Sequence, residues 1–235
     1  MLNDDVIAFK DPKSVAAESY RALRTNLEFS MSSNHLNTVL VTSSHVSEGK
    51  SSVCSNLGTL FAMQDKKVII VDADMRRGTQ HEKFGLSNKD GLSSFLANLN
   101  TSFEKIIKKT EVPNLFVITS GPIPPNPSEL ISSQNMKDLL QVLKESFDFV
   151  IIDGAPVLPV TDSVILSAIC DKVVLVVSSE ETHKDELKSA KKLLVAAGAN
   201  IAGVVLNKVD FKQKNYKYNK HGYYNSYYNS SDDKE

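Results

Sequence analysis

The chain has 235 residues, with 27 Lys and Arg against 28 Asp and Glu, so its formal net charge is -1. This length suits one α/β domain, or two small ones, with a substantial buried core. The near-neutral charge argues against a strongly basic nucleic-acid binder, because neutralising phosphates requires clustered Lys and Arg.

The first predicted element is an amphipathic helix at about residues 12–29. It carries Glu18, Arg21 and Arg24 at spacings of three residues, which places them on roughly one helix face. Taken alone, such charges are usually a solvated face, where an ion pair contributes only a few tenths of a kcal/mol.

Short runs rich in Val and Ile follow and predict strands. Because they are apolar at successive positions, we expect them to be buried on both faces, as in a parallel sheet. Segments with apolar residues at helical spacing lie between several of these strands, and Gly198 predicts a C-cap at the end of the last predicted helix. The predicted strands are residues 38–42, 67–71, 115–119, 148–152, 172–177 and 202–206, and the predicted helices are residues 51–64, 136–145 and 184–197.

This alternation predicts an α/β fold, a doubly wound and mainly parallel sheet with helices on both faces. Functional residues are then expected at the C-terminal ends of the strands. Residues 212–235 contain no Leu, Ile, Val, Phe or Met. They cannot bury enough apolar surface to offset their ordering entropy, so we expect a folded domain at 1–211 and a disordered tail at 212–235.

A phosphate-binding motif follows the strand at 38–42. Gly49, Lys50 and Ser51 match the end of Gly-x-x-x-x-Gly-Lys-Ser/Thr, with Ser44 in the place of the first glycine. Backbone N–H groups at a helix N-terminus bind phosphates. Lys50 would reach the β- and γ-phosphates, Ser51 would hold Mg²⁺, and Ser52 would touch the α-phosphate. By itself, Gly-Lys-Ser fits a polar loop before a helix equally well.

Carboxylates end two of the predicted strands. Asp72 and Asp74 follow the strand at 67–71, and Asp153 follows the strand at 148–152. One such Asp is usually a turn or helix cap. Several at the sheet edge that carries Lys50 predict a Mg-nucleotide site, because Mg²⁺ prefers hard oxygen ligands.

These segments resemble the Walker A, A′ and B motifs of the bacterial tyrosine kinases of the capsule and exopolysaccharide type, the CpsD/CapB-like kinases. The motifs are the phosphate loop, VIIVDADMR and FVIIDGAPV, and SGPIPPNPSEL at residues 120–130 is similar to the same family. The resemblance spans roughly residues 12–235. It implies a P-loop kinase domain at 1–211 with the deviant-Walker, MinD-like fold.

The resemblance also implies a tyrosine autokinase that uses ATP and Mg²⁺. Asp72 would contact the magnesium shell and activate the tyrosine hydroxyl, Asp74 would support that site, and Asp153 would help to hold the metal. The implied nucleotide-binding residues are Ser47, Glu48, Gly49, Lys50, Ser51 and Ser52. Asn207, which begins an Asn-Lys-x-Asp match after the strand at 202–206, is a candidate adenine contact.

The loop departs from the family pattern at two positions. Ser47 stands where the family usually has glycine, and Val46 replaces a usual proline. A glycine at position 47 would tolerate a positive φ and a close backbone approach to phosphate. We therefore expect Ser47 to affect loop geometry and ATP affinity.

Tyrosines are concentrated in the tail. Six of the seven tyrosines lie there: Tyr216, Tyr218, Tyr223, Tyr224, Tyr227 and Tyr228. Composition alone leaves a sticky low-complexity tail as the alternative. The resemblance implies that they are phosphoacceptors, modified in trans between subunits. Each phosphate adds about -1.5 to -2 charges, so we expect phosphorylation to weaken tail docking and favour ring disassembly.

The family further implies a homo-oligomer, an octameric ring held through Glu18, Arg21 and Arg24. The other implied partners are a transmembrane activator of the polysaccharide co-polymerase type and a cognate phosphotyrosine phosphatase. We expect no nucleic-acid partner. The controlled process would be capsular or extracellular polysaccharide synthesis and export.

Three other functions remain open. A MinD/ParA-like switch ATPase usually carries a signature lysine five residues before the loop lysine, where this chain has His45, and the tail is not an amphipathic membrane helix. A GTPase is suggested by the Asn-Lys-x-Asp match at 207–210, although 153–156 does not match Asp-x-x-Gly. The third alternative is an inactive scaffold, because Ser47 departs from the family pattern in the phosphate loop.

The cysteine content and the lengths of the apolar runs indicate where in the cell the protein is expected. Cys54 and Cys170 lack partners at metal-ligand spacing, so we expect reduced core residues and no disulfide framework or zinc site. No apolar run approaches the roughly 18–20 residues of a membrane helix, and the N-terminus does not resemble a signal peptide. These features predict a cytoplasmic protein that reaches the inner face of the membrane through a partner.

Overall fold

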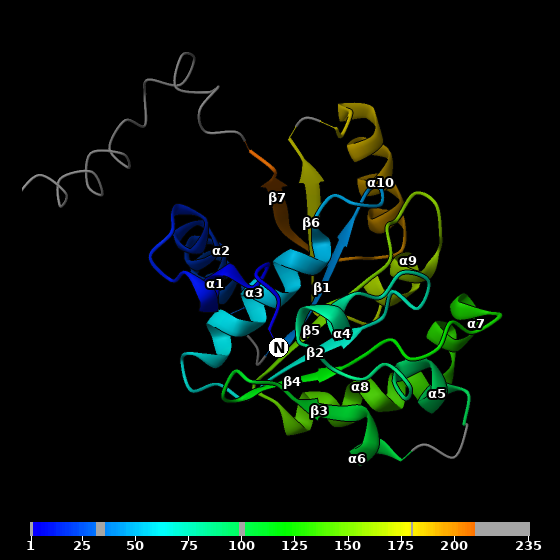
Figure 1. Ribbon diagram of the computed structural model, residues 1–235. Helices are drawn as coiled ribbons and strands as arrows, with labels where there is room; N and C mark the ends of the chain where they lie inside the picture. Colours follow the sequence, from blue (N-terminus) through cyan, green and yellow to red (C-terminus); the bar gives the residue numbers. More distant parts are fainter. Residues whose placement is uncertain (1, 32–35, 99–101, 180, 210–235) are drawn as a thin grey trace, which may run out of the picture.

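The computed structural model describes residues 2–31, 36–98, 102–179 and 181–209 (Figure 1). These residues form a sheet of seven strands in the order β3-β4-β2-β5-β1-β6-β7. Neighbouring strands are parallel, except that β3 is antiparallel to β4. The strands are β1 Thr38–Ser43, β2 Val68–Asp72, β3 Ile107–Lys109, β4 Leu115–Ile118, β5 Phe149–Asp153, β6 Lys172–Ser178 and β7 Ile201–Asn207.

Helices cover both faces of this sheet, which confirms the predicted α/β architecture. On one face, α2 and α3 pack against residues such as Val39 and Val41, and α1 lies against these two helices. On the other, α5 to α10 pack against Leu40 and its neighbours. The helices are α1 Ile7–Lys10, α2 Val15–Met31, α3 Lys50–Ala62, α4 Gln80–Lys83, α5 Leu92–Leu96, α6 Phe103–Ile106, α7 Pro127–Ser132, α8 Gln134–Ser146, α9 Asp162–Ser167 and α10 Lys184–Ala196.

The predicted strands differ in burial. β1, β2 and β5 are buried at every residue, as their uninterrupted apolar runs predict. For β7 the expectation of burial on both faces is wrong, since Val204 is 52% exposed and Leu206 is 53% exposed. Among the described residues β7 pairs with β6 alone, so it forms one edge of the sheet. β3 forms the other edge and has no Val/Ile run to predict it.

Helix boundaries follow local capping. α2 begins at Val15 rather than residue 12, because the Ser14 hydroxyl accepts a hydrogen bond from the Ala17 N–H at 3.2 Å. Gly198 follows α10 with φ +82°, and its N–H donates to the Val195 carbonyl at 3.0 Å. Gly198 therefore ends the helix in the left-handed conformation that a glycine C-cap uses.

Both cysteines are buried and free, as expected. Cys54 lies in α3, and Cys170 precedes β6, where burial raises the pKa of its thiol to about 12. In the part of the chain that the structure describes, no helix combines the length and the apolar character needed to cross a bilayer.

One carboxylate aligns the starts of the adjacent strands β1 and β6. Asp171 accepts hydrogen bonds from the Thr38 hydroxyl at 2.7 Å and from the N–H groups of Asn37 and Thr38 at 3.1 and 3.0 Å. Lys144 of α8 donates to its other oxygen at 2.9 Å. Burial would raise the pKa of Asp171, but these hydrogen bonds outweigh it and hold the pKa below its usual range.

We therefore predict that Asp171→Asn lowers the free energy of unfolding at pH 7 by about 1–2 kcal/mol, because charge-assisted hydrogen bonds are lost. A carboxylate with a depressed folded-state pKa stabilises above its unfolded pKa of about 3.9 and loses that effect as pH falls through the folded value. The difference between variant and wild type should shrink below about pH 4. Urea unfolding across this range tests it, with the surface variant Asp185→Asn as control. An equal difference at low pH would contradict the assignment.

Candidate ATP-binding site

The phosphate loop joins β1 to α3 at the C-terminal edge of the sheet. Gly49 directly precedes α3 with φ +93°. A Cβ at this position would lie 1.9 Å from the side-chain nitrogen of Asn207, so neither the conformation nor the space admits another residue. The Asn207 amide donates to the Glu48 carbonyl at 2.9 Å, which ties the loop to the end of β7.

The loop backbone is strained at Ser47. Its φ of +62° is the left-handed conformation that glycine would adopt without cost. Glu48 is buried and holds the loop from inside, since its carboxylate accepts from the His45 N–H at 2.8 Å and from the Thr182 hydroxyl. The Glu48 side chain thus organises the loop, and only the backbone there is free to face a nucleotide.

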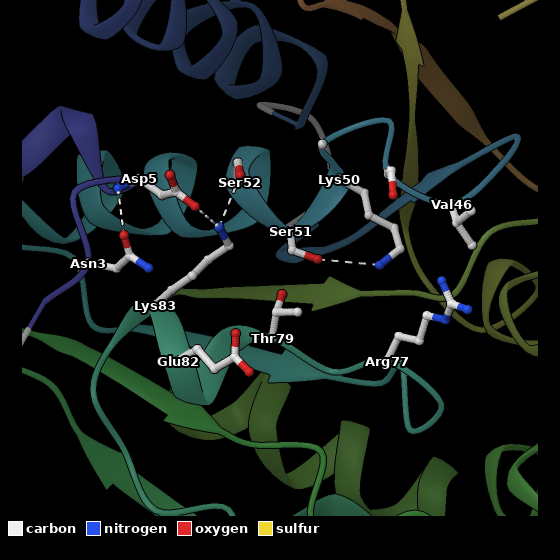
Figure 2. Close-up of a pocket in the computed structure, with 12 residues that line it drawn as sticks. Asn3, Asp5, Val46, Lys50, Ser51, Ser52, Arg77, Thr79, Glu82 and Lys83 are labelled. Atoms are coloured by element: carbon white, nitrogen blue, oxygen red, sulfur yellow. Dashed lines mark hydrogen bonds and ion pairs between the residues drawn. The ribbon is translucent and has the colours of Figure 1, made fainter. Parts of the chain in front are cut away.

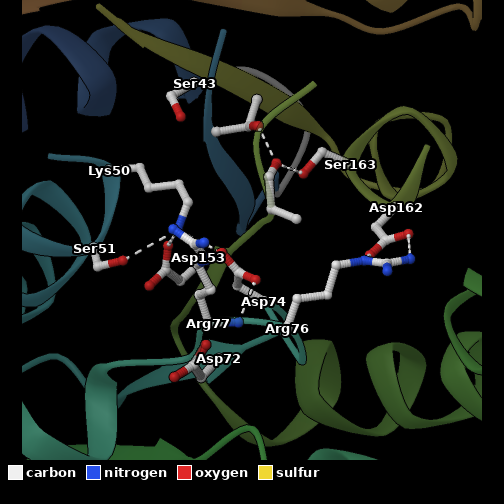
Figure 3. Close-up of polar contacts among 12 residues, drawn as sticks. Ser43, Lys50, Ser51, Asp72, Asp74, Arg76, Arg77, Asp153, Asp162 and Ser163 are labelled. Carbon is white, nitrogen blue, oxygen red and sulfur yellow. Dashed lines mark hydrogen bonds and ion pairs between the residues drawn. The ribbon is translucent and has the colours of Figure 1, made fainter. Parts of the chain in front are cut away.

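Lys50 and three carboxylates meet at this edge (Figure 3). The register of β2 and β5 sets Asp72 directly opposite Asp153. The Lys50 ammonium lies 2.8 Å from Asp74 and 3.6 Å from Asp153, and it donates to the Ser51 hydroxyl at 3.3 Å. Burial would lower the pKa of Lys50, but the carboxylates outweigh it and raise that pKa above its usual range. Lys50 is therefore held as a cation.

Asp72 is fully buried. Burial and the charge of Asp153 raise the pKa of its carboxyl well above its usual range, against the opposing effect of a hydrogen bond from the Gln80 N–H at 3.0 Å. A raised pKa makes Asp72 a stronger base than a surface aspartate.

The carboxylates fit a magnesium ion. Asp72 Oδ1 and Asp153 Oδ1 are buried without a hydrogen-bond partner, and Ser51 lies beside them. Such unpartnered oxygens are ligands that Mg²⁺ prefers. Within the described ranges, no group of three His, Cys, Asp or Glu side chains could hold a metal alone. Mg²⁺ needs only one or two carboxylates when waters and substrate phosphates complete its shell.

Gln80 belongs to this site although no motif predicts it. It is fully buried in α4, and its amide donates to Asp153 Oδ2 at 2.8 Å and to the Ser51 carbonyl at 3.0 Å. These bonds leave the Oδ1 atom of Asp153 without a hydrogen bond, 3.6 Å from the Lys50 ammonium. The only sequence signal is its place shortly after the Asp72 strand end.

A cavity of about 310 Å³ opens beside the phosphate loop (Figure 2). The residues Arg77 to Lys83 form one wall, and the N-terminal segment contributes Asn3 and Asp5. Lys83 is buried, with its ammonium 2.9 Å from Asp5 and 3.0 Å from the Ser52 hydroxyl. The sequence did not single out Arg77 or Lys83, because cations distant from the Gly-Lys-Ser motif carry no signature.

The remaining candidates lie elsewhere. Arg21 donates to Glu18 at 2.7 Å on the surface of α2. Arg24 turns inward instead, with its side chain 16% exposed and an Nη1 atom 3.4 Å from the Leu60 carbonyl of α3. The six tail tyrosines, at positions 216–228, lie outside the described residues.

The parallel sheet, the phosphate loop and the Lys50–carboxylate cluster define a phosphate-loop ATP-binding protein. A family model described as AAA domain matches residues 38–194, and the chain belongs to that family.

Similar proteins identify which kind of ATP-binding protein this is. The chain is 41% identical to the tyrosine-protein kinase YwqD of Bacillus subtilis (strain 168), over 94% of this chain and 91% of that protein. Two solved structures agree. The chimerical protein CapA2B2 matches with TM-score 0.84 and 43% identity over 88% of this chain and 91% of that one. The kinase domain of Escherichia coli tyrosine kinase ETK matches with TM-score 0.83 and 34% identity over 87% and 82%. This chain belongs to the bacterial tyrosine-protein kinases and is an ATP-binding phosphotransferase.

We predict that Gln80→Leu weakens magnesium-dependent nucleotide binding by about 10- to 100-fold, because partners that orient metal ligands have effects of that size. Binding of fluorescent ADP titrated with Mg²⁺ measures it. Gln141→Leu, on the outer face of α8, is the control. Unchanged magnesium dependence in the Gln80 variant would show that Asp153 needs no such positioning.

Proposed function

We propose that this kinase transfers the γ-phosphate of ATP to tyrosines of its own C-terminal tail, in trans between subunits, and thereby regulates capsular or extracellular polysaccharide synthesis and export. The observation that carries the proposal is the meeting of the Lys50 ammonium with Asp72, Asp74 and Asp153 at one sheet edge, beside a cavity. A cation there suits phosphate, and a basic carboxylate suits a tyrosine hydroxyl.

The residues divide the work as follows. Lys50 and the backbone N–H groups at the start of α3 bind the β- and γ-phosphates. Ser51, Asp72 and Asp153 would hold Mg²⁺, which neutralises phosphate charge when bound. Asp72 accepts the tyrosine proton, from a phenol whose pKa is about 10. Asp74 anchors the ammonium of Lys50.

Phosphotyrosine formation with Mg-ATP tests the proposal. Wild type should accumulate phosphotyrosine, and Lys50→Met should accumulate none because the phosphate-binding cation is gone. Replacing the six tail tyrosines with Phe should also abolish the signal. Tyr20→Phe, in α2, is the matched control and should retain it.

Mixing two variants that do not label themselves tests transfer in trans. The Lys50→Met chain keeps its tail, and the six-Phe chain keeps its active site, so the mixture should label the Lys50→Met chain. A mixture that stays unlabelled contradicts transfer between subunits. ATP hydrolysis without phosphotyrosine in any sample would favour the alternative, a MinD/ParA-like switch ATPase.

Oligomerisation through α2 is the second part of the proposal. Because Arg24 packs against α3 inside the same chain, Arg21 is the sharper probe. Arg21→Glu should lower the mass measured by light scattering, with Lys13→Glu as control, and an unchanged mass would oppose a ring contact at this face. Phosphorylation should lower the wild-type mass in the same way, through charge repulsion.

We also propose a transmembrane activator of the polysaccharide co-polymerase type and a phosphotyrosine phosphatase as partners. The activator would hold this chain at the inner face of the membrane. The structural similarity to the chimerical protein CapA2B2 supports the proposal of an activator. The phosphatase follows from the need to reverse a modification that alters tail charge.

A further inference from the structure

Two adjacent arginines in the loop after β2 have side chains that point to different places. Arg76 is held away from the cavity, because its Nε donates to Asp162 at 3.0 Å and its Nη2 to the Ser128 hydroxyl at 3.2 Å. Asp162 is fully buried at the start of α9. Arg76 therefore joins the loop after β2 to α7 and α9.

Arg77 points into the cavity instead. Its backbone N–H donates to Asp74 Oδ1 at 3.0 Å, which fixes where the side chain begins. Figures 2 and 3 show the guanidinium turned toward the Lys50 ammonium, and Figure 2 shows Val46 nearby. Within the described ranges, no carboxylate forms an ion pair with this guanidinium.

Two cations side by side repel each other unless an anion lies between them. Lys50 has carboxylate partners in Asp74 and Asp153, at 2.8 and 3.6 Å. The Arg77 guanidinium lines the cavity beside Lys50 without such a partner among the described side chains, so it is available to an incoming anion. The His45 side chain, where switch ATPases carry a signature lysine, is directed to Glu186 of α10 at 3.1 Å.

We propose that Arg77 is a catalytic residue that contacts the phosphoryl group during transfer and stabilises the negative charge on its oxygens. The planar guanidinium presents several donors to such oxygens, which a single ammonium cannot match. The proposal rests on the ATP site described above. It does not depend on which tyrosine accepts the phosphate. Arginines that act in this way raise kcat by about 10³- to 10⁵-fold.

The experiment compares binding of ADP alone with binding of ADP and aluminium fluoride, which imitates a phosphoryl group in transfer. Wild type should bind the fluoride complex far more tightly than ADP. Arg77→Ala should keep its ADP affinity and lose that gain, and kcat for phosphotransfer should fall by about 10³-fold. Arg77→Lys should recover only part of both. Lys137→Ala, on the exposed face of α8, is the control and should behave like wild type.

The proposal is overturned if Arg77→Ala gains as much from fluoride as wild type, or if its affinity for ADP falls as far as its affinity for the fluoride complex. It is also overturned if wild type gains nothing, or if Lys137→Ala loses the gain equally. Because the fluoride complex needs no acceptor tyrosine, a chain whose tail is not phosphorylated still tests Arg77. Failure of the tail as substrate and failure of Arg77 are thus separate results.

Discussion

The buried ion cluster around Lys50 is the constraint on which the rest of the site depends. Asp72 and Asp153 are fully buried and Asp74 almost so, and an isolated carboxylate would be costly there. Lys50 compensates part of this charge, and hydrogen bonds from Gln80 satisfy one oxygen each of Asp72 and Asp153. Three carboxylates face one ammonium, and Asp72 Oδ1 and Asp153 Oδ1 accept no hydrogen bond, so the cluster can still take up a metal cation.

Strand order makes this cluster possible. β5 lies between β2 and β1, so the carboxylates that end β2 and β5 meet the loop that leaves β1. All three strands are parallel, and their C-terminal ends therefore share one edge. The uninterrupted Val and Ile runs bury these strands on both faces, which fixes the register that sets Asp72 opposite Asp153. Packing of the core and charge at the site are consequences of the same sequence pattern.

The sequence predicted this architecture well because parallel strands and strand-end carboxylates are local signals. Long apolar runs and Gly-Lys-Ser need no knowledge of distant residues. Contacts between distant residues were not predictable in the same way: the hydrogen bond from Gln80 to Asp153 spans 73 residues. Adjacent residues can also have different environments that the sequence does not indicate. The Arg76 side chain binds Asp162, whereas the Arg77 side chain lines the cavity. Likewise, the composition of β7 gives no sign that it lies at an edge.

The phosphate loop shows how a departure from the family pattern is accommodated. Ser47 occupies a backbone region that costs a non-glycine residue about 1–2 kcal/mol. Such strain persists only where surrounding contacts determine the conformation. Here Glu48 bonds to His45 and Thr182, and Asn207 bonds to the Glu48 carbonyl. These anchors come from the segment after β6 and from the end of β7, so the loop conformation is determined by tertiary contacts. A glycine at position 47 would therefore relieve strain without being needed to define the loop.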